Sequence, residues 1–256
     1  MLTQFAVRMI CGMSLVLAAM PQATVASGFY RVQMLIVMGL GVLATLAAQT
    51  PPASAGVAPW IGQVHYALCI VLAGLGFLAS VFWTLDKRRI AIALLNVISV
   101  LSFTAMSLGI LLVAGNWQLH WTCVVLSDFS SALTLGGAMC GMLLGHSYLT
   151  SPTMAITPLL RLNDFLGWAG VVRGLISVVV LLVAWPFLRG DSTWVWLTLR
   201  WIAGIGGPLL VWQMVQRILV FKNTQAATGV LFVGVILTLL GELTGTLLLA
   251  VTGYPL

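Results

Sequence analysis

The sequence predicts an all-α fold, a polytopic transmembrane helix bundle of about eight spans that forms one membrane domain over residues 1–256. Composition is the first observation behind this prediction, because 61% of the residues are hydrophobic, only 6% are charged and the mean hydropathy is +1.12. A soluble domain carries about 25% charged residues, so this chain has too little polar surface to face water. The second observation is that the apolar residues form runs of about 20, the length that an α-helix needs to cross a bilayer.

Eight apolar runs are long enough to be spans, and short connections rich in proline, glycine and asparagine separate them. The predicted spans cover residues 4–20, 29–48, 60–85, 90–114, 119–149, 164–187, 193–221 and 226–252. None of the connections is long enough for a soluble domain. The two halves share no motif and no matching pair of broken helices, which would be typical of an inverted-repeat transporter.

The positive charges predict the orientation of the spans. Residues 86–89 include three consecutive basic residues, and loops of this kind stay in the cytoplasm. With eight spans, both termini then lie outside. The first run and residues 23–26 resemble a signal peptide, but its removal would place residues 86–89 outside, so we expect the run to remain as a span. The net charge of +6 reflects basic residues at span ends and does not indicate nucleic-acid binding.

Tryptophans mark the predicted outer ends of several spans, which is typical of a membrane interface, and we expect a partner subunit to cover this face. They are Trp60, Trp117, Trp121, Trp185, Trp194 and Trp196. The bilayer is the other expected partner, in the bacterial cytoplasmic membrane. The four cysteines are isolated in apolar runs without zinc or iron–sulfur spacing, so we expect no metal site in this chain.

Glycines four residues apart are the candidate helix-packing positions, because small residues at this spacing let helices approach closely. They are Gly137, Gly141 and Gly145 on the fifth span, and Gly241 and Gly245 on the eighth. Residues 204–208 hold three glycines and a proline, which can kink the seventh span and free backbone carbonyls. Asp128 precedes Gly137 by nine residues, so at about 100° per residue the two lie on opposite faces of the fifth span.

A charge near the bilayer centre costs roughly 2.5–3.5 kcal/mol and therefore needs a partner or a function, and seven ionisable residues of the predicted spans are the candidates. They are Arg8, His65, His120, Asp128, Arg173, Arg200 and Glu242. Counting from the span ends places Arg173 nearer the inner side and the other six in the outer half. In one interpretation, the carboxylates of Asp128 and Glu242 pair with arginines and hold the bundle together, with Arg200 and Arg8 as the partners.

In the other interpretation, these groups line a polar pocket that opens toward the outer face and binds a quinol. The candidate pocket residues are Glu242, Asp128, His65, Tyr66 and Arg200. A carboxylate or a histidine accepts the hydroxyl proton of the quinol while apolar walls hold its ring. A haem between His65 and His120 is a weaker alternative that we do not expect, and His146 lies at the inner end of its span.

Two segments resemble a known family. Residues 121–149, with Phe129, Gly136-Gly137 and the run GMLLG at 141–145, look like a middle span of the dimethyl-sulfoxide-reductase membrane anchors, the DmsC type, which are related to NrfD-type subunits. Residues 239–245, LLGELTG, are similar to the last span of that family with its Gly-Glu-Leu-x-Gly pattern. The resemblance implies an anchor for an iron–sulfur subunit and a molybdenum catalytic subunit. It also implies that quinol is oxidised near the outer face, with Glu242 as a candidate quinol-site residue.

The leading hypothesis is therefore a membrane-anchor subunit of a respiratory redox complex, which interacts with menaquinol or ubiquinol and passes electrons to a partner subunit. Such a chain is at most a quinol-oxidising subunit of an oxidoreductase. A small-molecule transporter or permease is one alternative, and a non-redox membrane assembly or scaffold protein is another. A membrane hydrolase is not expected, because the sequence holds neither an H-E-x-x-H nor a G-x-S-x-G motif.

Overall fold

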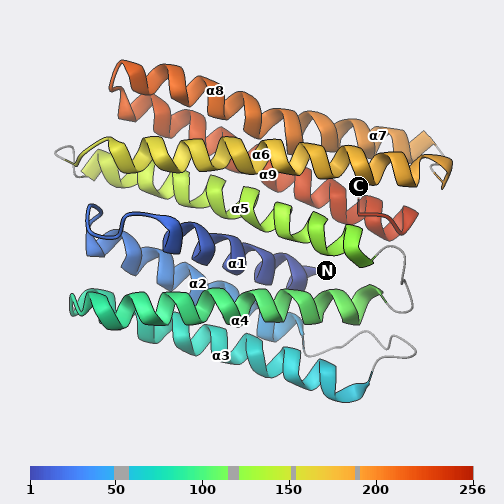
Figure 1. Cartoon of the computed structure of the whole chain (residues 1–256), viewed down its shortest axis with the longest axis horizontal. Helices are drawn as coiled ribbons and strands as arrows, with labels where there is room; N and C mark the ends of the chain where they lie inside the picture. The colour runs from blue at the N-terminus through green and yellow to red at the C-terminus, as the bar shows by residue number, and fades with distance from the viewer. Residues whose placement is uncertain (49–57, 115–120, 151–153, 188–190, 256) are drawn as a thin grey trace. The chain divides into compact units, whose positions relative to one another are not determined.

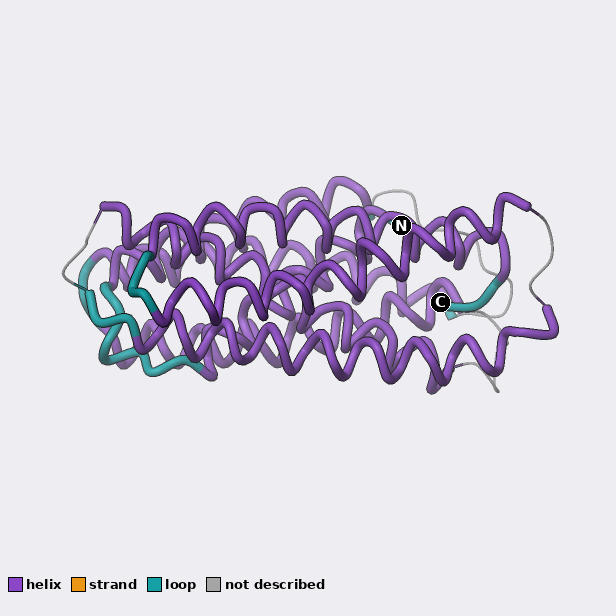
Figure 2. Tube along the Cα trace, turned by 90° about the horizontal axis from the view of Figure 1, so that it is seen from above, coloured by secondary structure: helices purple, strands orange, loops and turns teal. Residues whose placement is uncertain are grey.

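The computed structural model describes residues 1–48, 58–114, 121–150, 154–187 and 191–255 (Figure 1). Nearly all of these residues are helical, and none of them forms a strand (Figure 2). Eight helices in the described ranges are long and apolar enough to cross a membrane. The prediction of an all-α protein with about eight spans is therefore confirmed, and the chain is an integral membrane protein. The predicted outside position of both termini stays a prediction.

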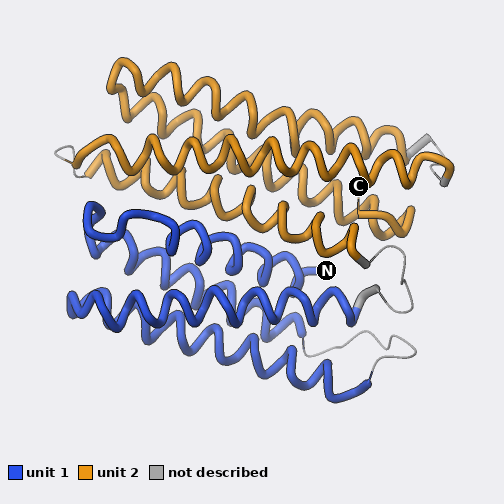
Figure 3. The backbone as a smooth tube through the Cα atoms, viewed as in Figure 1, with its two compact units in different colours: residues 1–121 blue, residues 122–256 orange. Residues whose placement is uncertain are grey.

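The helices belong to two compact units, residues 1–121 and residues 122–256 (Figure 3). Unit 1 contains α1 (Leu2–Ala19), α2 (Ser27–Ala47), α3 (Pro59–Thr84) and α4 (Arg88–Ala114). Unit 2 contains α5 (Trp121–Thr150), α6 (Thr157–Ala184), η1 (Trp185–Phe187), α7 (Asp191–Leu199), η2 (Arg200–Gly206), α8 (Gly207–Val220) and α9 (Thr224–Thr252). The expectation of a single domain over the whole chain stays a prediction.

Local residue chemistry explains where several helices begin and end. Pro59 and Pro158 occupy the first two positions of α3 and α6, where a missing N–H breaks no helical hydrogen bond. Asn223 caps α9, because its side-chain oxygen accepts a hydrogen bond at 3.0 Å from the backbone N–H three residues later. Gly253 ends α9 with a positive φ of 75°, a conformation that glycine adopts without strain.

The sixth span begins earlier than the sequence predicted. Hydropathy indicated a span over residues 164–187, whereas α6 runs over Thr157–Ala184. The polar residues Arg161, Asn163 and Asp164 belong to the first turns of this helix. The helix begins at Thr157, and Pro158 is its second residue. The predicted start at residue 164 was therefore wrong, because hydropathy responds to side-chain polarity whereas the helix start depends on backbone constraints.

The seventh span changes its helical form partway along. It consists of α7, then the π-helix η2 of seven residues, then α8. The π-helix includes Gly204 and Gly206, and Pro208 follows it and cannot donate a backbone hydrogen bond to the preceding turn. The kink and the freed carbonyls expected for residues 204–208 stay predictions. Within unit 2, α9 packs against α7, η2 and α8, and α6 packs against α8. The π-helix thus lies against α9.

Candidate functional site

The buried charges of unit 2 meet at the carboxylate of Glu242 on α9, which is 4% exposed. Its Oε1 accepts hydrogen bonds from Nη2 of Arg173 at 3.3 Å and from Nη1 of Arg200 at 3.2 Å. The hydroxyl of Ser131 donates to the other carboxylate oxygen, Oε2. We call this group the Glu242 cluster, and it consists of Ser127, Ser130, Ser131, Arg173, Arg200 and Glu242.

Arg173 of α6 joins the carboxylate to α5. Its Nη1 donates to the backbone oxygen of Ser127 at 2.6 Å, to the hydroxyl of Ser127 at 2.7 Å and to the hydroxyl of Ser130 at 3.1 Å. The hydroxyl of Ser127 in turn donates to the backbone oxygen of Pro255 at 3.0 Å. One guanidinium group therefore connects α5, α6 and α9, and the segment after α9 is tied to the same point.

Arg200 is the first residue of the π-helix η2 and is fully buried. Besides the carboxylate of Glu242, its Nη1 donates to the backbone oxygen of Gly241 at 2.8 Å. Thr244 also donates to this oxygen, at 2.8 Å. The arginine thus has both a charged and a neutral acceptor on α9, and hydrogen bonds to charged groups are the stronger kind in a buried setting.

The glycine pair of α9 makes room for these contacts. A Cβ atom on Gly241 would collide with the backbone of Gly204 in η2, and a Cβ on Gly204 would lie 2.8 Å from the Cα of Gly241. A Cβ on Gly245 would lie 3.1 Å from the guanidinium carbon of Arg200. The first glycine therefore admits the backbone of the π-helix, and the second admits the arginine side chain.

The glycine ladder of α5 is less tightly packed. The nearest atoms to a Cβ built on Gly137 or Gly141 would be side-chain carbons at 3.4 and 3.5 Å, which is ordinary van der Waals contact. A Cβ on Gly145 would lie 2.7 Å from the hydroxyl oxygen of Thr228 on α9. Of the three, Gly145 is thus the position where α5 and α9 approach most closely.

Arg173 is the main correction to the predicted site. Sequence counting placed it nearer the inner side of its span and apart from the other charges, but its guanidinium contacts Glu242 directly. The error came from the predicted start of the span at residue 164. In a helix that begins at residue 157, Arg173 lies past the middle, closer to the end that precedes Trp185.

The other predicted pocket residues are distributed over both units. Asp128 is buried on α5 and follows Ser127, so its side chain leaves the helix at about 100° from that serine. His65 and Tyr66 belong to α3 of unit 1, where His65 is buried and hydrogen-bonds to the backbone of Ala105, and Tyr66 is half-buried. That these residues share one pocket with Glu242 and Arg200 stays a prediction.

The expected absence of a haem and of a metal site stays a prediction. His120, which the weaker haem alternative required, lies outside the described residues. His146 is exposed at the far end of α5. Among the residues that the structure describes, no three histidine, cysteine or carboxylate side chains gather in a way that could hold a metal ion.

Sequence analysis did not identify the serines of the Glu242 cluster. Ser127, Ser130, Ser131 and Thr134 are all buried, and they recur at the spacing that places residues on one face of a helix. A row of hydroxyl side chains on one face of an apolar span indicates that this face hydrogen-bonds to polar groups of a neighbouring helix. It was overlooked because serine carries no charge and therefore does not stand out in a search for ionisable groups.

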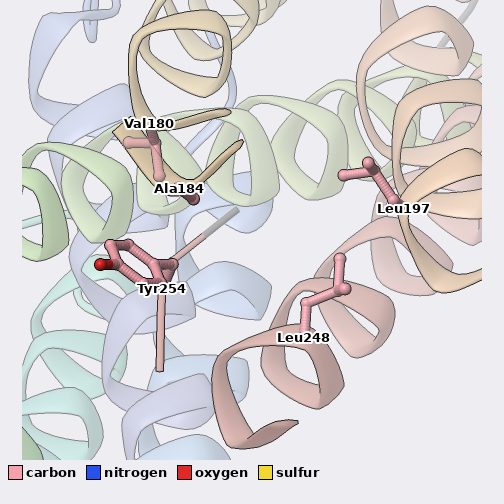
Figure 4. Packing of buried hydrophobic residues seen from close by; sticks show 5 residues of the cluster. All are labelled: Val180, Ala184, Leu197, Leu248 and Tyr254. Carbon is pink, nitrogen blue, oxygen red and sulfur yellow. The ribbon is translucent and has the colours of Figure 1, made fainter. Parts of the chain in front are cut away.

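An apolar cluster of unit 2 begins two turns along α6 from Arg173. Figure 4 shows its buried members, which come from α6, α7, α9 and the segment after α9. They are Val180, Ala184, Leu197, Leu248 and Tyr254. The half-buried Trp196 and Trp201 pack against them. We call these five buried residues the Tyr254 cluster. Helix α6 contributes both Arg173 to the Glu242 cluster and Val180 and Ala184 to the Tyr254 cluster.

The chemistry available to this part of unit 2 is hydrogen bonding beside an apolar surface. A carboxylate that two guanidinium groups and a hydroxyl hold in place is a fixed, oriented group, and removing it from water is offset only because its partners are present. No family model, curated protein or solved structure matches the chain.

Proposed function

We propose that the chain is the membrane-anchor subunit of a respiratory redox complex and that it binds a quinol in unit 2, beside the Glu242 cluster. The observation that carries this proposal is the buried Glu242 carboxylate, which Arg173 and Arg200 hold within membrane-spanning helices close to an aliphatic and aromatic cluster. A quinol has two polar oxygens on an apolar ring with an apolar tail, and it matches the change from the charged Glu242 cluster to the apolar Tyr254 cluster.

In the proposed reaction, quinol loses two electrons and two protons and becomes quinone. The carboxylate of Glu242 accepts a hydrogen bond from one quinol hydroxyl and then its proton, as a positioned general base does, and the proton of the other hydroxyl passes to water. Arg173 and Arg200 are positioning residues, because they fix the direction of the carboxylate. The electrons pass to an iron–sulfur partner subunit, and menaquinol or ubiquinol is the electron donor. The resemblance of residues 239–245 to the DmsC type of anchor supports the same assignment.

A second candidate function is a non-redox scaffold, and one specific observation favours it. Both oxygens of Glu242 already accept hydrogen bonds from protein groups, from Ser131 on one side and from Arg173 and Arg200 on the other. An ionic group satisfied in this way can serve to hold α5, α6, η2 and α9 together. In that case the Glu242 cluster binds no ligand, and substitutions in the cluster affect only folding.

Purification in a mild detergent separates the two candidates. If the chain is a quinol-binding anchor, solvent extracts of the purified protein contain menaquinone or ubiquinone by chromatography, and an iron–sulfur protein co-purifies. Glu242→Gln then slows quinol oxidation by the purified complex about 100-fold or more, the size of a lost general base. The exposed Asp164→Asn is the matched control and leaves the rate unchanged. A protein that carries neither quinone nor a redox partner contradicts the proposal and leaves the scaffold function.

A further inference from the structure

Two buried hydrogen-bond donors on α6 lie next to the Glu242 cluster. They are the Nε–H of Arg173 and the hydroxyl of Ser177, and both residues are 3% exposed. Among the described residues, neither atom has a hydrogen-bond partner. Most buried polar groups are paired, so a buried donor without a protein acceptor calls for a specific explanation. Two such donors in one place point to a ligand that supplies the acceptor.

The two donors lie on the same side of α6. Arg173 and Ser177 are four residues apart, which places their side chains on one face of the helix, one turn from each other. The guanidinium group of Arg173 is planar, and its Nη atoms are held by Ser127, Ser130 and Glu242. Because the whole group is rigid, these bonds also fix the direction of the Nε–H.

The surroundings of Ser177 become apolar along the helix. Val180 and Ala184, which belong to the Tyr254 cluster, follow on α6 after one and two further turns (Figure 4). Leu248 of α9 and Tyr254, which follows α9, belong to the same cluster. Along α6, the donor pair therefore lies between the Glu242 carboxylate and the buried Tyr254 cluster.

Neutral acceptor chemistry fits this position best. The charge of Arg173 is already paired with the carboxylate of Glu242, so a ligand need not bring a negative charge. The two free donors are an N–H and an O–H, and a carbonyl oxygen offers two lone pairs to receive them. A carbonyl on an apolar ring is the head group of a quinone.

We propose that the Nε–H of Arg173 and the hydroxyl of Ser177 donate hydrogen bonds to one carbonyl oxygen of a bound quinone, whose ring lies against the Tyr254 cluster. This inference rests on the proposed quinol-binding function and names residues that bind the oxidised form of the same ligand. Ser177 and Arg173 are then ligand-binding residues for the quinone, and the donor pair favours the carbonyl of the product over the hydroxyl of the quinol.

The test is a titration of the purified full-length protein with decylubiquinone and, separately, with menadione. Binding is followed by quenching of tryptophan fluorescence, because Trp196 and Trp201 pack against the Tyr254 cluster. Ser177→Ala removes one donor and is expected to weaken binding about three- to tenfold, the effect of one net hydrogen bond. Ser147→Ala on α5 is the matched control, because among the described residues the Ser147 hydroxyl donates to the backbone oxygen of Leu144 in its own helix.

The outcomes separate this inference from the proposed function. If the unchanged protein binds neither quinone, the proposed function fails and the inference falls with it. If the unchanged protein binds a quinone and Ser177→Ala binds it equally well, the inference fails while the proposed function stands. Equal weakening in Ser177→Ala and Ser147→Ala also overturns the inference.

Ser177→Cys keeps the side-chain volume with a weaker donor, and it provides a second variant if Ser177→Ala does not fold. We expect it to bind with an affinity between those of serine and alanine, because a thiol donates only a weak hydrogen bond. An affinity equal to that of the unchanged protein would contradict a hydrogen bond at this position. The thermal unfolding temperature of each variant is measured alongside, since a purely structural serine would change stability without changing quinone affinity.

Discussion

Replacing Glu242 by glutamine removes one negative charge from between two buried arginines while keeping the size and shape of the side chain. The amide oxygen of glutamine can still accept hydrogen bonds from Arg173 and Arg200, which now meet Oε1 at 3.3 and 3.2 Å. The amide nitrogen cannot accept the hydrogen bond that Ser131 donates to Oε2. The change therefore removes a charge and one acceptor and leaves the packing volume intact.

The burial of the three groups determines the size of the effect. The side chains of Arg173, Arg200 and Glu242 are 4%, 0% and 4% exposed, so water cannot replace the lost carboxylate. Removing one partner of a buried ion pair costs about 3–5 kcal/mol. We expect about 3 kcal/mol, at the lower end of the range. The reason is that Arg173 keeps its serine acceptors and Arg200 keeps the backbone oxygen of Gly241.

The assay is thermal unfolding of the purified protein in one detergent. A loss of 3 kcal/mol corresponds to a Tm lower by about 6–12 °C in a chain of this length. Asp164→Asn is the matched control, because it makes the same carboxylate-to-amide change at an exposed residue of the same unit, where Asp164 accepts a hydrogen bond from Gln216. Exposed pairs contribute about 0–1 kcal/mol, so this control should unfold close to the unchanged protein.

A double-mutant cycle adds a direct test of the pairing. Combining Glu242→Gln with Arg173→Gln should cost less than the sum of the two single changes, because both remove the same interaction. If Glu242→Gln unfolds within about 1 kcal/mol of Asp164→Asn, or if the two losses simply add, the Glu242 cluster does not hold unit 2 together and the reasoning is refuted.

Two further changes test the packing and the hydrogen bonds around the cluster with the same unfolding measurement. Gly241→Ala should cost about 3 kcal/mol or more, because the new methyl group meets the backbone of Gly204, which cannot move aside as a side chain can. Gly229→Ala on the same helix has nothing within 4 Å of the new methyl group and should leave stability unchanged, so equal losses in the two variants would contradict the close approach. Ser131→Ala should cost about 1.5–3 kcal/mol, because Glu242 loses a donor to its buried carboxylate, and an unchanged unfolding temperature would show that this hydrogen bond is not formed.

The number of spans was predictable because it depends on properties that lie within each segment. In lipid, a backbone satisfies its own hydrogen bonds only as a helix or in a closed barrel, so each run of about 20 apolar residues forms a helix regardless of its neighbours. The boundary of α6 was missed because its first turns are polar. Pro158 and the backbone at that point start the helix, and hydropathy does not include this information.

The candidate site was predictable in part. Glu242 and Arg200 stand out in the sequence as charges in apolar spans, and the ion pair between them, one of the two interpretations left open, is present in the structure. Arg173 was assigned to the wrong depth because an error of seven residues at the start of its helix shifts its position by about 10 Å along the axis. Ser131 was missed because a neutral hydroxyl in a span usually bonds to its own helix, and only a neighbouring carboxylate gives it another role.

By itself, the sequence determined that this protein lies in a membrane, that it is helical, and which residues carry charges that need partners there. Its composition and its apolar lengths suffice for these conclusions, because they concern the transfer of single segments from water to lipid. Only the tertiary structure decided that Arg173 joins Arg200 at the carboxylate of Glu242, and that Gly241 admits a π-helix where Gly141 admits ordinary side-chain contact. These features depend on the axial register between helices distant in the chain, and small shifts in that register change which groups meet.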